Sequence, residues 1–258
     1  MCIINEPAEV HETEILVSPH SNGTDQLTVY ANNVQTESNN NMMLLPVPYP
    51  NTVEFINLEN YQSIFKDLEK SFDKNYGSFG RKSKSRSLGV VDVGSYKATL
   101  VPTHADLDRI DPDVFGVVQN KIKVILKENY QDLPSSFGYI ICKLNSGTVV
   151  KYHPFAYKHK MVVNKEGKKV LFIPTRHEHG DKKTLIEDIP EADWDHAIYS
   201  LNTSMQAGNR TQYHRSVELK MNKVPKFDFG NIHTINKKVI KGVHANNDLI
   251  FDISSFET

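Results

Sequence analysis

Cysteine is scarce in this sequence, with one residue at position 2 and one at position 142. The first seven residues also lack the basic start and the long apolar stretch that are typical of a secretory signal. Two cysteines in a chain without such a signal argue against a disulfide framework and indicate a reducing compartment. We therefore expect a cytoplasmic protein.

Long apolar runs and an excess of positive charge are absent as well. No apolar stretch approaches the ~20 residues that a membrane-spanning helix needs. The formal net charge is -1 and the isoelectric point is about 6.8, so no positive field attracts a phosphate backbone. These absences exclude a membrane span and disfavour nucleic-acid binding. With 39% hydrophobic and 24% charged residues, the 258-residue chain is predicted to form a single globular domain over residues 1–258.

Several catalytic and nucleotide-binding motifs are missing. The sequence has no Gly-x-x-x-x-Gly-Lys-Ser/Thr phosphate loop and no Gly-x-Gly-x-x-Gly segment after a strand, so nucleotide binding lacks support. It has neither a Gly-x-Ser-x-Gly elbow nor the His-Glu-x-x-His zinc-protease helix. We expect no cofactor.

Strand patterns dominate what is present. The apolar positions and the turn residues between them predict strands at 3–4, 14–17, 26–31, 42–47, 88–93, 96–101, 137–144, 148–153, 157–163, 170–173, 195–201, 238–243 and 249–253. Pro46 and Pro48 are expected to stop regular pairing, since proline donates no hydrogen bond to a ladder. Asn145, Ser146 and Gly147 predict a hairpin that joins 137–144 to 148–153.

Two helices are predicted among these strands. The apolar stripe over residues 61–72 predicts the first, and Asp111-Pro112 opens a second whose stripe runs from Val114 to Leu126. Residues 73–87 are predicted to be a mobile basic loop, and residues 202–231 a loop-rich segment. The fold class is therefore α+β, with mainly antiparallel sheets and two principal helices.

Cys2 is the strongest candidate for chemistry. Once Met1 is removed, one residue carries a free amine and a thiol, and the amine can take the thiol proton to give the nucleophilic thiolate. His153 or His177 offers an alternative base if the first strand lies beside them. The competing interpretation is that Cys2 is a small buried hydrophobe in an apolar strand.

Histidines gather in the β-rich half of the sequence. If residues 176–179 are extended, His177 and His179 project from the same face and can orient a substrate beside Cys2. The same pair could instead bind a metal with a third ligand from one of two other histidines or from a carboxylate. These candidates are His153, His196, Asp193 and Asp195. A third interpretation gives these histidines only packing or surface roles.

A set of short motifs runs along most of the chain. They are the Met1-Cys2 start, Leu45-Pro46-Val47-Pro48, His153-Pro154, His177-Glu178-His179 and Asp195-His196. With these motifs the chain resembles a family of uncharacterised proteins of bacteria and large DNA viruses, which implies one continuous domain and a viral protein as one possible source, located in the host cytoplasm or the virion. The Met-Cys start is also distantly similar to that of N-terminal-nucleophile hydrolases, although Ile3 stands where those chains have glycine.

The leading functional interpretation is a thiol hydrolase of a small amide or peptide substrate. Its catalytic residues would be Cys2, His153, His177 and His179, with no metal. Two alternatives stay open. One is a non-catalytic structural or partner-binding protein, such as a virion component, and the other is a metal-assisted hydrolase that uses the His177 and His179 pair.

Overall fold

The computed structural model describes most of the chain. The described residues are 2–72, 92–93, 96–131, 133, 136–145, 150–179, 190–201, 209–212, 224, 228–229 and 234–253. The predicted basic loop at 73–87 lies outside these residues, and so does most of the segment at 202–231.

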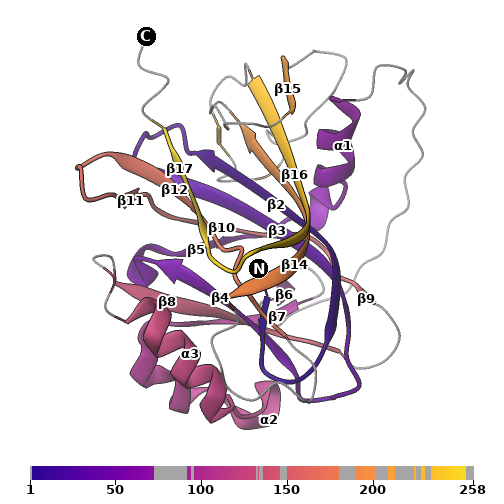
Figure 1. Cartoon of the computed structure of the whole chain (residues 1–258), viewed down its shortest axis with the longest axis vertical. Helices are drawn as coiled ribbons and strands as arrows, with labels where there is room; N and C mark the ends of the chain where they lie inside the picture. Colours follow the sequence, from indigo (N-terminus) through magenta and orange to yellow (C-terminus); the bar gives the residue numbers. More distant parts are fainter. Residues whose placement is uncertain are drawn as a thin grey trace.

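The described strands form two large sheets and one small sheet (Figure 1). The first sheet has the order β13 (His177–Glu178), β1 (Cys2–Ile4), β4 (Met42–Pro48), β8 (Phe137–Lys143), β7 (Tyr96–Val101) and β6 (Asp92–Val93). The second has the order β15 (Asn209–Gln212), β16 (Thr234–Ala245), β14 (Glu191–Leu201), β2 (Glu9–Pro19), β3 (Asp25–Gln35), β10 (Phe155–Lys160) and β5 (Glu54–Ile56), with β9 (Val150–Lys151) also paired to β3. The third joins β11 (Val162–Val163), β12 (Lys169–Ile173) and β17 (Leu249–Asp252).

Most of this pairing is antiparallel. Among the described strands, only β1 with β13 and β14 with β2 run parallel. The helical segments are η1 (Pro50–Thr52), η2 (Glu59–Tyr61), α1 (Ile64–Lys70), η3 (His104–Arg109), α2 (Pro112–Phe115) and α3 (Asn120–Tyr130). The predicted α+β class is therefore confirmed. The longest described helix, α3, has 11 residues, and none of the described helices could span a membrane.

Three apolar clusters explain why the strands read as continuous apolar runs. Ile4, Leu45 and Ile140 face a core between the two large sheets, whereas their chain neighbours Ile3, Leu44 and Ile141 pack with α2 and α3 on the outer face of the first sheet. A third cluster packs α1 on the outer face of the second sheet. Figure 1 shows α2 and α3 along β8, with α1 on the opposite side of the molecule. Strands covered on both faces lose the polar alternation of a half-exposed sheet.

Pro46 and Pro48 do not stop the pairing of β4, contrary to expectation. β4 pairs with β8 as far as Pro48, which lies opposite Phe137. On its other side β4 pairs with β1 only at Met43 and Leu44. Both prolines therefore lie where one edge of the strand has no neighbour among the described strands, and proline is tolerated at such positions.

The predicted helix from Asp111 to Leu126 is broken into α2 and α3. Gly116 has φ +82°, and a Cβ there would lie 2.7 Å from the Asn40 carbonyl oxygen. The Asn5 side chain accepts from the Gln119 backbone N–H and donates to the Val117 carbonyl, which fixes the break. As a result Val117, expected in the buried stripe, is 70% exposed.

The predicted hairpin over 137–153 is also wrong. β8 pairs with β4 and β7 in the first sheet, whereas β9 pairs with β3 in the second. The chain therefore crosses between the sheets after β8, because β8 already has a partner on each side.

Candidate functional site

β1 lies between β13 and β4, which places the beginning of the chain beside the paired histidines. The backbone of Cys2 is in register with that of His177, and Ile3 is in register with Glu178. His177 contacts Trp194 and His196 of β14, so its ring occupies the space between the two large sheets. The sequence could not show this juxtaposition of Cys2 and His177.

Three imidazoles and one indole form a compact group, which we call the histidine cluster (His177, His179, Trp194 and His196). The His177 Nδ1 and His179 Nε2 atoms are 3.0 Å apart. The His177 and His196 ring centroids are 4.7 Å apart, and those of Trp194 and His196 are 5.0 Å apart. The pair expected to project from one face is thus in direct contact.

Burial keeps these imidazoles neutral. His177 is 6% exposed and His196 is 1% exposed. Desolvation lowers the pKa of His177 to about 2 and that of His179 to about 4, and it lowers the pKa of His196 even further below the usual range. Neutral imidazoles at pH 7 are proton acceptors rather than cations.

The hydrogen bonds of the cluster assign the ring protons of His177 and His179. His179 donates a hydrogen bond to the Ala8 backbone carbonyl, and its Nε2 atom is hydrogen-bonded to His177. The nitrogen that donates to Ala8 is therefore Nδ1, which carries the proton. A neutral His179 then accepts at Nε2, which makes Nδ1 of His177 the donor between the two rings. Nε2 of His177 is left as an acceptor without a hydrogen-bond partner among the described residues.

His153 lies on a different pair of strands from the cluster. It sits between β9 and β10, which pair with β3 and β5 in the second sheet and not with β1 or β13. Burial lowers the pKa of His153, and the Glu59 carboxylate of η2 partly opposes that shift. The backbone of Cys2 thus lies beside His177, which contacts His179, whereas His153 lies elsewhere.

The described part of the chain offers no group of side chains arranged as a metal site. No group of three or more His, Cys, Asp or Glu side chains among the described residues is arranged to hold a metal ion. Asp195, a candidate ligand in the sequence, accepts a hydrogen bond from the Glu12 backbone N–H at 3.2 Å and lies 3.1 Å from the Lys241 ammonium. It alternates with Trp194 and His196 along β14 and so projects from the opposite face.

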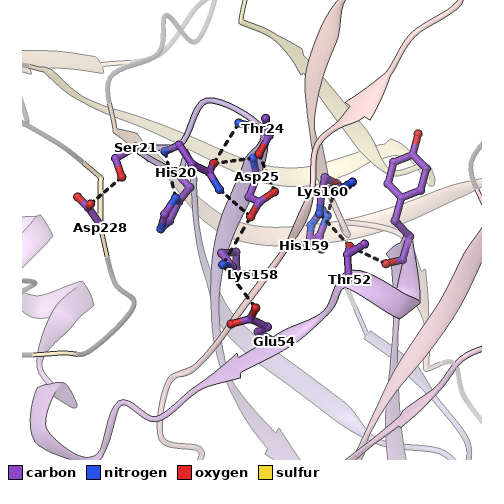
Figure 2. Close-up of polar contacts among 12 residues, drawn as sticks. His20, Ser21, Thr24, Asp25, Thr52, Glu54, Lys158, His159, Lys160 and Asp228 are labelled. Atoms are coloured by element: carbon purple, nitrogen blue, oxygen red, sulfur yellow. Dashed lines mark hydrogen bonds and ion pairs between the residues drawn. The ribbon is translucent and has the colours of Figure 1, made fainter.

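A second polar group, drawn in Figure 2, has a structural role. The Lys158 ammonium lies 3.5 Å from Asp25 and 3.7 Å from Glu54, which links β10 to β3 and β5. The neighbouring His159 ring bonds to the Lys160 carbonyl at 2.8 Å, and burial lowers its pKa to about 4. This group therefore ties three strands of the second sheet together.

The comparisons with known proteins support the fold alone. No family model matches the chain, and no curated protein matches it in sequence. The chain is similar to the crystal structure of baculovirus P35, with a TM-score of 0.56 and 11% sequence identity over 98% of this chain and 99% of that one. The likeness covers the whole architecture and carries no residue roles.

Proposed function

We propose that this protein is a thiol-dependent hydrolase of a small amide or peptide, with Cys2 as the nucleophile and His177 as its base. The observation that supports the proposal is the register of Cys2 with His177, whose Nε2 is the acceptor left without a partner among the described residues. Residues in register on neighbouring strands project from the same face of a sheet. The proposal therefore puts the thiol next to the imidazole.

The reaction proceeds by acyl transfer. As the Cys2 sulfur attacks the carbonyl carbon, its proton moves to Nε2 of His177 and the carbonyl oxygen becomes an oxyanion. The low pKa of the resting imidazole rises when negative charge develops beside it, because an opposite charge favours the protonated form. His177 then returns the proton to the leaving amine. Water attacks the thioester, which releases the acid and restores the thiol.

We assign to Trp194 the role of stabilising the oxyanion. Its side chain is 3% exposed, and its Nε1–H has no acceptor among the described residues. A buried donor without an acceptor costs roughly 1–3 kcal/mol, which a ligand oxygen would offset. The ring lies 5.7 Å from that of His177, within reach of the same substrate.

Acylation by 4-nitrophenyl acetate tests this function. We expect intact-mass analysis and peptide mapping to find one acetyl group on Cys2, and none at that position in Cys2→Ser. Trp194→Phe keeps the aromatic packing but removes the N–H, so acetylation should slow by about 100-fold, the typical effect of losing one oxyanion donor. Alkylation by iodoacetamide forms no oxyanion and should keep its rate. Acetylation of lysines or Cys142 alone would contradict the proposal.

A partner-binding protein without catalysis is the second candidate. It is favoured by the deep burial of the cluster, since Trp194 and His196 are as inaccessible as ordinary core residues. A folded protein whose Cys2 stays inert toward both reagents would support this candidate. The expected cytoplasmic location, the viral source and the lack of nucleic-acid binding remain predictions.

A further inference from the structure

The outer edge of β13 is held by a side chain instead of a strand. Among the described strands, β13 is the edge strand of the first sheet, and β1 covers only its inner side. On the other side Asn246, which is 5% exposed, accepts the His177 backbone N–H at 2.6 Å and donates to the His177 carbonyl at 2.8 Å. One amide group thus pairs with both backbone groups of His177, as a neighbouring strand would.

The two residues before His177 are held by the same segment. Asp248 accepts the backbone N–H groups of Thr175 and Arg176 at 2.8 and 3.0 Å. The Thr175 hydroxyl donates to the Asn247 carbonyl at 2.9 Å, and Arg176 donates to the Asn246 carbonyl at 3.0 Å. The Tyr130 hydroxyl of α3 donates to Asp248 at 2.6 Å. Residues 246–248, between β16 and β17, therefore form a clasp around residues 175–177.

We propose that Asn246 is a positioning residue that holds His177 in register with Cys2. The inference rests on the proposed function, because the imidazole it positions is the base assigned there. An edge strand of two residues has too few ladder bonds to fix a ring by itself, whereas two hydrogen bonds to the residue that carries the ring fix its backbone. Catalytic geometry tolerates little displacement, so the loss of these bonds should be visible in the chemistry of Cys2.

The test is a double-mutant cycle on the rate of Cys2 alkylation by iodoacetamide at pH 6.5. Asn246→Ala leaves both backbone groups of His177 unpaired, and we expect alkylation to slow by about tenfold or more, as in His177→Gln. The double variant should be no slower than His177→Gln alone, since Asn246 acts through that ring. Asn246→Asp keeps the acceptor for the His177 N–H but sets a carboxylate oxygen against the His177 carbonyl. It should therefore also slow alkylation, and it is the variant to use if the alanine protein does not fold.

Thr175→Val is the matched control. It removes one hydrogen bond of the same clasp and leaves both bonds to His177 in place, so it should lower the melting temperature without slowing alkylation. If His177→Gln slows the reaction and Asn246→Ala does not, the positioning role is overturned while the proposed function stands. Equal slowing by Thr175→Val would also overturn it, because general loosening would then explain the effect. An unchanged rate in His177→Gln would overturn the proposed function itself.

Discussion

Acidification from pH 7 to pH 4 is expected to unfold this protein. Burial lowers the pKa values of His177, His179, His196 and His159 well below the ~6.5 of an unfolded histidine. Below pH 6.5 the unfolded chain therefore binds protons that the folded chain does not, and stability falls as the pH falls. The stability that depends on keeping these histidines neutral is fully present above pH 6.5 and is lost progressively toward pH 4 and below.

The expected effect is large compared with ordinary stability. Each such histidine removes about 1.4 kcal/mol per pH unit, so four of them remove several kcal/mol within two units. The total free energy of unfolding of a natural domain is roughly 5–15 kcal/mol. Urea unfolding at pH 7.0, 6.0, 5.0 and 4.5 measures the slope directly. His159→Phe keeps a ring against Tyr157 and removes one titrating group. The slope of the unfolding free energy against pH should then fall by the share of about one bound proton. A stability that does not change with pH would contradict the burial of these imidazoles.

Replacing Gly138 in β8 with alanine is expected to destabilise the protein strongly. An added Cβ would lie 2.5 Å from the Val101 carbonyl oxygen and 2.6 Å from Cβ of Pro50. Backbone and a proline ring cannot rotate away, so β7 or η1 must shift, and we expect a loss of about 3 kcal/mol or more.

Ser136→Ala is the control for that substitution, because residue 136 is exposed just before the same strand. Its free energy of unfolding should stay within about 0.5 kcal/mol of the wild-type value. Urea denaturation compares the three proteins. Equal stability of Gly138→Ala and Ser136→Ala would show that β8 does not approach β7 and η1 so closely.

The positions of most strands and the fold class could be predicted, because runs of apolar residues indicate buried strands. Which strands pair with each other could not be predicted. Residues 137–143 read as a strand, yet nothing local shows that β4 and β7 occupy both of its sides. The break between α2 and α3 depends on Asn40 and Asn5, far from Gly116 in the sequence. Periodicity alone therefore extended the helix through Val117.

The same limit applies to the candidate site. The contact of His177 with His179 follows from a spacing of two in an extended segment, and this local expectation is confirmed. The neighbours of that pair come from two places that are distant in the sequence: β1 pairs with β13 in parallel, and β14 belongs to the second sheet, which packs against the first. Asn246 lies 69 residues after His177. Residues 246–248 fall between two predicted strands, and no local signal in the sequence marks them as a clasp.

The pH profile of Cys2 alkylation tests the central claim most directly. Iodoacetamide labelling at several pH values from 5.5 to 8, followed by peptide mapping, reports Cys2 and the buried Cys142 in the same sample. We predict that Cys2 reacts faster than Cys142 throughout, and that His177→Gln slows Cys2 at pH 6.5 by about tenfold or more while Cys142 is unaffected. A Cys2 rate that is the same with and without His177 would contradict the claim that this histidine serves the thiol.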